Sequence, residues 1–376
     1  MSIKIAVLKE TVADERRVAL DPSVVSRLKK MGAEILLETG AGDPAYFTND
    51  SYGDAHLVEN AAAALKEADI LLRVQPPSEA EIAQLKSGSL LISHIYAHQN
   101  QALVKALQAN NITCMAMELI PRITRAQAMD SLSSQATVAG YKAVLMAASL
   151  VPRFFPMLTT AAGTIRPSKV VVIGAGVAGL QAIATARRLG AQVEAYDIRP
   201  AAREQVESLG AKMIDTGVNA EGEGGYAREL TDEEKQQQAD VLAQHLAKAD
   251  AVISTAAIPG RPAPKIISTA MVDGMKPGAV IVDLAAETGG NCELTEAGKT
   301  IHYKSKILHG PLNIASEAPF HASEMYAKNL LNLLTLMIEE GELKIDFDDD
   351  VIKGCLLTHE GKITHPPTAT LIEGEA

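Results

Sequence analysis

A glycine-rich turn between a buried strand and a helix constrains this chain more than any other feature. The apolar run Val170-Val171-Val172-Ile173 leads directly into Gly174-Ala175-Gly176-Val177-Ala178-Gly179, and a helical pattern continues from Leu180 to Leu189. In such a unit the first glycine permits the tight turn, the second lets the backbone approach a pyrophosphate, and the third lets helix and strand pack closely. The N–H groups at the helix start would hold the phosphates. The pattern therefore predicts a domain that binds a dinucleotide.

The next predicted strand indicates which dinucleotide is bound. It ends in Asp197, close to the spacing of about 20 residues at which a carboxylate accepts hydrogen bonds from the adenosine ribose. A 2′-phosphate at this place would meet a like charge. Arg199 follows closely and would favour a phosphate, but Asp197 occupies the strand end. The sequence therefore predicts NAD(H) rather than NADP(H).

Strand-length apolar runs alternate with helical patterns along the whole chain, which is typical of parallel sheets built from βαβ units. We expect an α/β fold of two doubly wound, Rossmann-like domains joined by long helices. The first domain is predicted at 1–135 with 330–376, and the NAD-binding domain at 136–329. The predicted strands are Ile3–Leu8, Glu34–Glu38, Ile70–Val74, Leu90–Ile95 and Thr113–Glu118, then Lys169–Ile173, Gln192–Asp197, Lys212–Asp215, Ala251–Ser254, Ala279–Asp283 and Lys306–His309.

Helical patterns and the tail complete this expectation. A helix is predicted from Asp21, as N-cap, to Met31, with Pro22 at its first position. A helix over Ala126–Phe155 should link the domains, and an apolar helix is expected at about Ala322–Glu340. The tail is expected to fold back on the first domain. Its strand-like runs are Lys344–Phe347, Ile352–Thr358 and Lys362–His365, with a hairpin turn at 359–362.

Composition excludes several classes of function. A net charge of −11 disfavours general binding to nucleic acid or anionic membranes. The three cysteines are widely spaced and suggest neither a disulfide framework nor a zinc site, and no histidine pair has metal-ligand spacing. The most apolar stretch, Ala143–Ile165, is interrupted by Pro152, Arg153 and Pro156, whereas a membrane-spanning helix needs about 20 apolar residues. We therefore expect no metal and no spanning helix in this chain.

Two polar segments are candidates for the rest of the site. Residues 121–135, at the predicted domain junction, carry Arg122, Gln127, Asp130 and Ser133, which suit a carboxamide and a ribose. A capped helix N-terminus explains the same spacing equally well. Residues 216–228 are rich in glycine and end near a tyrosine; such a loop is usually functional or disordered, and both interpretations stay open.

The chain resembles the NAD(H)-binding component, domain I or alpha-1 subunit, of proton-translocating NAD(P) transhydrogenase. The resemblance covers nearly the whole chain. The stretches that carry it are Met117–Gln127, Gly174–Arg188, Glu204–Gly210, Gly224–Ala227, Ile258–Pro264, Val282–Leu284 and Gly289–Asn291. The segment His309–Ala318 departs from the usual run of that family.

The resemblance implies a set of cofactor contacts. The residues implied to hold and position the nicotinamide and its ribose are Arg122, Gln127, Asp130 and Ser133. Those implied to hold the pyrophosphate and adenosine are Val177, Asp197, Ile198 and Arg199, beside the glycines Gly174, Gly176 and Gly179. Gly225 and Tyr226 would belong to a mobile loop, and Gln238 and Ala257 would line the site.

The resemblance also implies partners and a location. It implies a homodimer, an NADP(H)-binding component, and a membrane-spanning subunit that couples hydride transfer to proton movement. The chain would lie in the cytoplasm, on the inner face of the membrane through these subunits. Hydride would pass directly from NADH to NADP⁺ on the partner, so that the work of this chain is positioning.

Alanine dehydrogenase shares the fold and is the alternative, together with a non-catalytic NAD sensor. Alanine dehydrogenase needs an arginine and a lysine, which bind its substrate, and a catalytic histidine and an aspartate. The chain has an arginine within Glu15–Ala19, but Gln75 stands for the lysine and Glu287 for the aspartate. Tyr96 stands for the histidine, with His94 and His98 on either side as remaining candidates. Without the lysine no cation polarises a keto acid, and the proton-transfer partner is in question.

Overall fold

The computed structural model describes residues 2–218, 230–258 and 260–374. The chain forms two compact units, Met1–Gln135 with Ala315–Ala376, and Ala136–Ile314. The chain returns from the second unit to the first at Ala315, whereas the sequence predicted this boundary at residue 330. The difference arises because helix α10, Pro319–Leu334, is continuous and buries Tyr326 and Leu330 in the core of the first unit.

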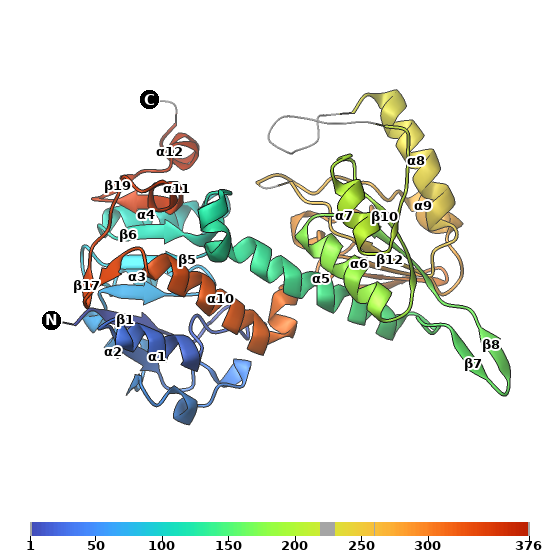
Figure 1. The fold of residues 1–376 in the computed structure, drawn as a ribbon. Coiled ribbons are helices and arrows are strands. Elements are labelled where there is room, and N and C mark those ends of the chain that lie inside the picture. The colour runs from blue at the N-terminus through green and yellow to red at the C-terminus, as the bar shows by residue number, and fades with distance from the viewer. Residues whose placement is uncertain (1, 219–229, 259, 375–376) are drawn as a thin grey trace. The chain divides into compact units, whose positions relative to one another are not determined.

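The first unit contains an eight-stranded sheet in the order β19-β18-β6-β5-β4-β1-β2-β3 (Figure 1). Strands β1 to β6 pair in parallel with one another, and β18 joins β6 antiparallel, so the tail folds back on this unit as predicted. The strand bounds are β1 Lys4–Val7, β2 Glu34–Glu38, β3 His56–Val58, β4 Ile70–Leu72, β5 Leu90–Ser93, β6 Thr113–Ala116, β18 Leu356–His359 and β19 Lys362–Ile363.

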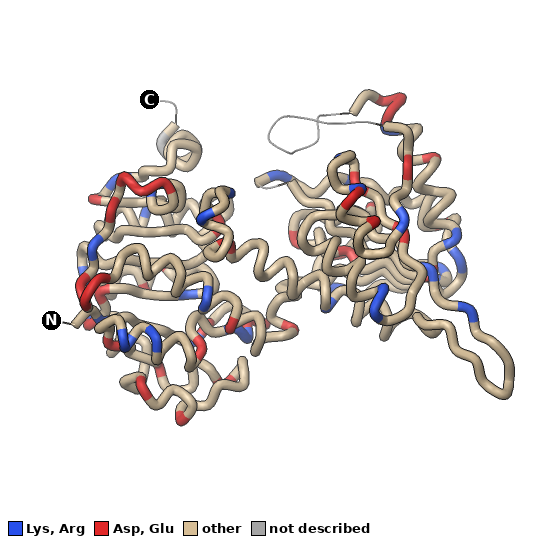
Figure 2. The backbone as a smooth tube through the Cα atoms, viewed as in Figure 1, with Lys and Arg blue, Asp and Glu red and all other residues tan. Residues whose placement is uncertain are grey.

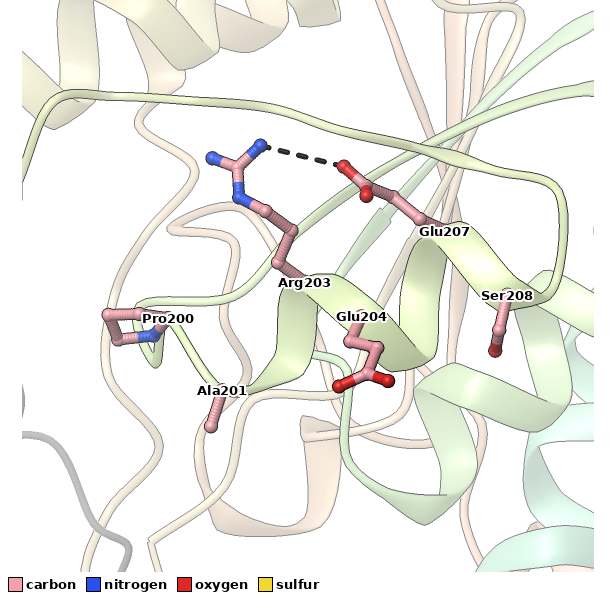
Figure 3. A pocket seen from close by; sticks show the side chains of 6 residues that line it. All are labelled: Pro200, Ala201, Arg203, Glu204, Glu207 and Ser208. Atoms are coloured by element: carbon pink, nitrogen blue, oxygen red, sulfur yellow. Dashed lines mark ion pairs between the residues drawn. The ribbon is translucent and has the colours of Figure 1, made fainter.

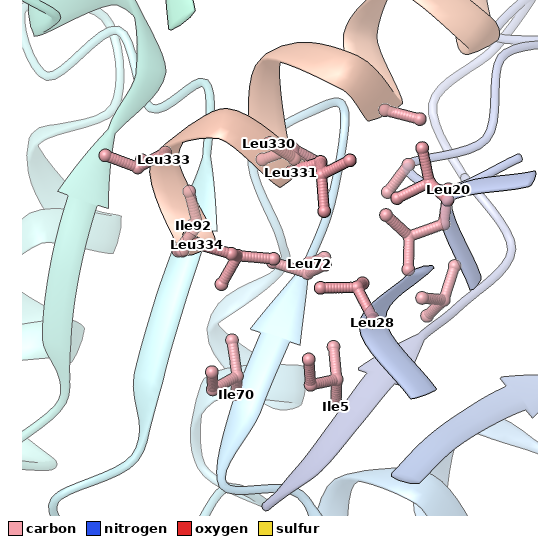
Figure 4. Packing of buried hydrophobic residues seen from close by; sticks show 14 of the residues in the cluster. Ile5, Leu20, Leu28, Ile70, Leu72, Ile92, Leu330, Leu331, Leu333 and Leu334 are labelled. Atoms are coloured by element: carbon pink, nitrogen blue, oxygen red, sulfur yellow. The ribbon is translucent and has the colours of Figure 1, made fainter. Parts of the chain in front are cut away.

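Helices cover both faces of this sheet. Ile5 and Val7 enter one core, whereas Ala6 enters the other, as the alternation of side chains along a strand requires. Figure 4 shows Leu330, Leu331 and Leu334 of α10 together with Leu72 and Ile92 in the first of these cores. The remaining helices are α1 Pro22–Lys30, α2 Ala61–Glu67, α3 Glu79–Ile82, α4 Gln101–Ala109, α11 Asp350–Cys355 and α12 Pro366–Glu373, with 3-10 turns η1 Asp43–Ala45, η2 Asn49–Tyr52, η3 Met117–Leu119 and η4 Thr124–Met129.

The tail departs from its prediction in two places. Residues 344–347 form no strand, and the short ribbon there pairs β16 Ile338–Glu339 with β17 Glu342–Leu343. Ile352–Cys355 is helical, because the Asp349 side chain accepts hydrogen bonds from the N–H groups of Val351 and Ile352 and starts α11. The predicted hairpin between β18 and β19 is confirmed, with Glu360 and Gly361 both at positive φ.

The second unit contains a seven-stranded sheet in the order β11-β10-β9-β12-β13-β15-β14. β9 pairs in parallel with β10 on one side and β12 on the other, so the strand order reverses at β9, the place where doubly wound sheets bind ligands. The bounds are β9 Lys169–Ile173, β10 Gln192–Tyr196, β11 Lys212–Met213, β12 Ala251–Ser254, β13 Val280–Asp283, β14 Thr300–Tyr303 and β15 Lys306–His309; α6 Val177–Arg188, α7 Ala202–Ser208, α8 Asp232–Leu246 and α9 Thr269–Gly274; η6 Ala286–Thr288; and the hairpin β7 Leu158–Thr160 with β8 Gly163–Ile165.

One long helix, α5 Ser131–Leu150, runs from the first unit into the second, which confirms the predicted helical link. It is shorter than predicted because Thr124–Met129 forms η4 before it. The chain returns to the first unit through η7, Ile314–Glu317. Among the residues described, no helix combines the length and apolarity needed to cross a membrane. Acidic and basic residues are interspersed along both units (Figure 2).

Candidate nucleotide-binding site

The glycine turn that follows β9 has the geometry of a nucleotide-binding turn. Gly174 has a φ of 91°, and a Cβ there would lie 2.7 Å from Thr255 Oγ1. A Cβ on Gly179 would lie 1.8 Å from the Gly174 carbonyl oxygen. A Cβ on Gly176, by contrast, would meet no atom within 4 Å. The first and third glycines are therefore required by the protein's own packing, whereas the second faces open space.

Helix α6 begins in this turn with its N–H groups uncapped. Gly176 is its N-cap and has no side chain to accept a hydrogen bond, and no acidic residue lies in the first turn. Helix α5 packs directly on the first turn of α6, because a Cβ on Gly140 of α5 would lie 2.1 Å from the Ala178 carbonyl oxygen. Uncapped N–H groups at a supported helix start suit a pyrophosphate.

Asp197 follows β10 and its carboxylate turns toward the glycine turn. Oδ2 accepts a hydrogen bond from the Ala175 N–H (2.7 Å), and Oδ1 accepts one from the Arg199 N–H (2.9 Å). Burial disfavours the charge, but these bonds and those of the Arg199 guanidinium outweigh it and hold the pKa of Asp197 below its usual range. The carboxylate is therefore ionised and oriented. The Arg199 cation, which could attract a phosphate, is paired with it.

The other predicted contacts in this unit lie around the same strand ends. Ile198 is half-buried beside Asp197, and Ala257 is exposed in the loop after β12. Gln238 on α8 accepts a hydrogen bond from the Tyr196 hydroxyl (2.9 Å). Gly225 and Tyr226, with most of the predicted loop, lie outside the described residues.

Two further residues shape this site and were missed by sequence reasoning. Thr255 donates from Oγ1 to the Gly174 carbonyl oxygen (3.1 Å). The fully buried Asn291 accepts from the Ala256 N–H (3.0 Å) and donates to the carbonyl oxygens of Ala256 (2.7 Å) and Pro264 (2.9 Å). Both residues hold the loop after β12 beside the glycine turn. Asn291 belongs to a Gly-Gly-Asn stretch that carries the family resemblance, but its partners are distant in the sequence.

A separate hollow of about 520 Å³ lies along α7, beyond Arg199 (Figure 3). Arg203, which lines this hollow, forms ion pairs with Glu207 (3.6 Å) and Asp215 (2.9 Å). None of its lining residues was predicted to bind the cofactor. They are Pro200, Ala201, Arg203, Glu204, Glu207 and Ser208.

The polar set of residues 121–135 surrounds the start of α5 in the first unit. Asp130 accepts hydrogen bonds from the Ser133 N–H (2.9 Å) and hydroxyl (2.6 Å), and its own N–H donates to the Gln127 carbonyl oxygen (3.3 Å). The Arg122 and Gln127 side chains are exposed. Asp130 therefore caps α5, so the capped-helix interpretation holds. The same turn also presents a group of polar side chains to solvent.

Two residues at the alanine dehydrogenase positions, Arg17 and Gln75, bind the same carboxylate in the first unit, that of Glu15. Arg17 makes a buried ion pair with Glu15 (2.6 Å) and donates to Gln135 (2.9 Å). Gln75 fills the lysine position and donates to Glu15 Oε2 (2.7 Å). Burial acts to raise the pKa of Glu15, but Arg17, Gln75 and Ser316 lower it to about 2. A neutral amide thus replaces the cation that a keto acid would need.

His94 is buried and both of its ring nitrogens are occupied. Nδ1 lies 3.0 Å from the Val74 carbonyl oxygen and therefore carries the proton, while Nε2 accepts from the Ser131 hydroxyl (3.0 Å). Burial, with the nearby Arg17 charge, lowers the pKa of His94 to about 4. His98 is exposed, and Glu287 accepts a hydrogen bond from the Asn313 N–H (2.6 Å). His94 is therefore a neutral structural residue.

Comparison with known proteins assigns the chain to a family. The family models described as "Alanine dehydrogenase/PNT", N-terminal and C-terminal domain, match residues 6–139 and 143–366. An NAD(P) transhydrogenase alpha-subunit polypeptide of Rhodospirillum rubrum is 46% identical, over 97% of this chain and 98% of its own. The chain belongs to the NAD(P) transhydrogenase alpha-subunit family.

Two further matches separate this family from its alternative. The crystal structure of transhydrogenase from Sinorhizobium meliloti is 45% identical, with a TM-score of 0.88 over 96% of this chain and 99% of that one. The alanine dehydrogenase of Halomonas elongata is 28% identical over 98% of this chain and 96% of its own. The transhydrogenase alpha-subunit family thus shares far more of the sequence, and the predicted fold class of two Rossmann-like domains is confirmed.

Proposed function

We propose that this chain binds NADH and gives its hydride directly to NADP⁺ held on a partner component of an NAD(P) transhydrogenase. Two observations together carry the proposal. The glycine turn is open beside an ionised Asp197, and the residues at the alanine dehydrogenase positions do not provide that enzyme's cation or proton-transfer group. The keto-acid cation is replaced by the amide of Gln75, and His94 has both nitrogens engaged. The chain thus keeps a dinucleotide site and lacks an acid–base pair at those positions.

The residues around β9 fit NAD(H). The start of α6, with Gly176 and Val177, would hold the pyrophosphate, because its N–H groups are uncapped and the space above Gly176 is open. Asp197 would accept hydrogen bonds from the adenosine ribose, with Ile198 and Arg199 beside the adenosine. Gln238, Ala257, Gly225 and Tyr226 are proposed to complete the wall of the site.

Hydride transfer between two nicotinamides needs no base. The hydride leaves C4 of NADH with the bonding electron pair and adds to C4 of NADP⁺, which yields NAD⁺ and NADPH with no proton released. The protein therefore contributes proximity and orientation. We assign this role to Arg122, Gln127, Asp130 and Ser133, with Asp130 and Ser133 setting the pose of the ring and Gln127 facing the partner.

The proposed assembly is a homodimer that works with an NADP(H)-binding component and a membrane-spanning subunit at the cytoplasmic face. An exposed apolar surface supports self-association. The β7–β8 hairpin projects from the second unit (Figure 1), and Met157 beside it is 63% exposed. Phe154 and Ile165 are exposed near the same hairpin. Apolar residues exposed together on and beside a projecting hairpin are typical of a protein–protein contact.

One experiment separates the three functions. Because NADH and NADPH absorb alike, the acceptor is thionicotinamide-NADP⁺, whose reduced form absorbs at a different wavelength. The chain is mixed with NADH, this acceptor and an NADP(H)-binding component, and separately with NAD⁺ and L-alanine. We expect turnover only in the first mixture. Turnover with alanine would establish an alanine dehydrogenase, and NADH binding without turnover in either mixture would establish a sensor.

A further inference from the structure

Two asparagines on α10 converge on one carbonyl oxygen. The side-chain amides of Asn329 and Asn332 donate to the Ala128 oxygen at 2.8 Å and 3.1 Å. Residues three apart share one face of a helix, so both amides reach the same point. A carbonyl oxygen has two lone pairs, and both are used here. Ala128 belongs to η4 and directly follows Gln127.

Asn329 also reaches the first turn of α5. Its Oδ1 accepts a hydrogen bond from the Ser134 hydroxyl (2.7 Å), and Ser134 directly follows Ser133. One side chain therefore bridges η4 and α5. It joins the two segments that carry Gln127 on one side and Asp130 and Ser133 on the other.

The surroundings of Asn329 make this bridge a specific arrangement. The residue is only 6% exposed, and the adjacent Leu330 and Leu331 enter the hydrophobic core (Figure 4). A polar side chain at such a place is costly unless its hydrogen bonds are satisfied. An apolar residue would suit the core, whereas the amide selects one position for η4.

The Gln127 side chain lacks the anchoring of its neighbours. Ala126 and Met129 are buried in the core, whereas Gln127 is exposed. Its position therefore depends on the backbone of η4, which Asn329 and Asn332 hold at the next residue. Asp130 is already tied to α5 through Ser133. The asparagines thus determine where Gln127 lies relative to the start of α5.

We propose that Asn329 is a positioning residue for hydride transfer, with Asn332 as a secondary support. It holds the η4–α5 turn so that Gln127, Asp130 and Ser133 act on the nicotinamide as one rigid group. This inference rests on the proposed function and on the role proposed there for these three residues.

Three variants divide the bridge into its parts. Asn329→Ala removes both arms, whereas Ser134→Ala removes the arm to α5 together with the hydrogen bonds of the Ser134 hydroxyl to Ser131 and Gln135. Asn332→Ala removes the longer bond to Ala128 and leaves Asn329 in place, so it is the matched control. A fourth variant, Asn329→Asp, keeps the acceptor for Ser134 but turns an oxygen toward the Ala128 carbonyl, and its similar size preserves packing should Asn329→Ala fold poorly.

The first measurement is transfer from NADH to thionicotinamide-NADP⁺ in the complete enzyme. We expect Asn329→Ala and Asn329→Asp to lower kcat by about tenfold to a hundredfold, as a displacement near 1 Å does. The Kd for NADH should change by less than about twofold, because the phosphates are held by the other unit, and Asn332→Ala should lower kcat by only about twofold. Equal losses in kcat and NADH binding, or wild-type kcat in both Asn329 variants, would overturn the proposal.

The second measurement does not depend on the partner. Amide hydrogen exchange over residues 124–134 is compared between the wild-type chain and each variant. We expect faster exchange in Asn329→Ala than in Asn332→Ala. Unchanged exchange would show that the bridge does not hold η4 and α5 together. If the wild-type enzyme transfers no hydride while exchange still responds to Asn329→Ala, the bridge is supported and the proposed function is wrong.

Discussion

The guanidinium of Arg199 meets the carboxylate of Asp197 through two parallel hydrogen bonds of 2.9 Å at the end of β10. The same carboxylate accepts the Ala175 N–H from the glycine turn. Asp197 therefore joins the glycine turn to Arg199, and we propose that it also accepts hydrogen bonds from the adenosine ribose and offsets a cation that would attract a 2′-phosphate. We therefore expect the carboxylate of Asp197 to set the nucleotide preference.

Asp197→Asn should change that preference. The variant loses a charged acceptor for the ribose hydroxyls and removes the ion pair between Asp197 and Arg199. Hydrogen bonds to charged groups contribute about 1.5–3 kcal/mol, so we expect at least about tenfold weaker NADH binding, with tighter binding of NADPH. Arg199→Gln, which keeps the carboxylate, should preserve the preference for NADH. Fluorescence titration with both nucleotides measures the ratio, and an unchanged ratio in Asp197→Asn would contradict this account.

Alanine substitutions at two glycines should separate packing from binding. Gly176→Ala adds a Cβ in open space at a negative φ, so the melting temperature should hold while NADH binding weakens. Gly179→Ala places its Cβ against the Gly174 carbonyl oxygen, so stability and binding should fall together. A core clash of this kind costs typically about 1–3 kcal/mol. Thermal melts and NADH titrations of both variants provide the comparison, and wild-type NADH affinity in Gly176→Ala would refute the role of that glycine.

Gln75→Lys should not create an alanine dehydrogenase. The lysine would place a cation beside Glu15, where Gln75 now donates a hydrogen bond. His94 would stay neutral between Val74 and Ser131, so no proton-transfer partner is supplied. We expect no detectable reduction of NAD⁺ by L-alanine, assayed by absorbance. Turnover in this single variant would show that another residue serves as the acid or base.

Acidification should destabilise the first unit through His94. Its folded pKa of about 4 lies below the ordinary histidine value of 6.5, so the unfolded chain binds the proton more readily. The free energy of unfolding should therefore fall between about pH 6.5 and 4, by up to about 1.4 kcal/mol per pH unit. His94→Gln should remove this dependence, whereas His98→Gln, at an exposed position, should retain it. Urea unfolding at several pH values tests the difference, and equal pH dependence in wild type and His94→Gln would contradict it.

Glu15 extends the same argument to lower pH. Its folded pKa of about 2 lies below the ordinary glutamate value of 4.5, so its ion pair stabilises the fold above about pH 4.5. That stability is lost as the pH falls toward 2. Glu15→Gln should lower stability at pH 7 but flatten the curve below pH 4.5, as measured by the same unfolding series. A curve of unchanged shape would show that Glu15 does not titrate with folding.

Much of the fold could be predicted because strand, helix and turn patterns are local. The strand before Gly174, the helix after it, the N-cap at Asp21 and the hairpin at Glu360-Gly361 are each specified within a few residues. The errors also have local causes. The prediction extended a strand over Ile352–Cys355, where the Asp349 cap favours a helix, and it placed the domain crossing inside α10 because an apolar helix does not reveal which core it enters.

The amino-acid sequence by itself determined the two Rossmann-like units and the glycine turn, and it placed a carboxylate, Asp197, at the strand end beside that turn. These features could be predicted because backbone geometry and charge at a strand end act over short stretches. Only the tertiary structure decided that Asn329 meets Ala128, 201 residues away, that Asn291 holds the loop after β12, and that His94 is buried and neutral. These contacts depend on how helices and loops from distant parts of the chain pack together. No periodicity or spacing encodes which amide will face which carbonyl.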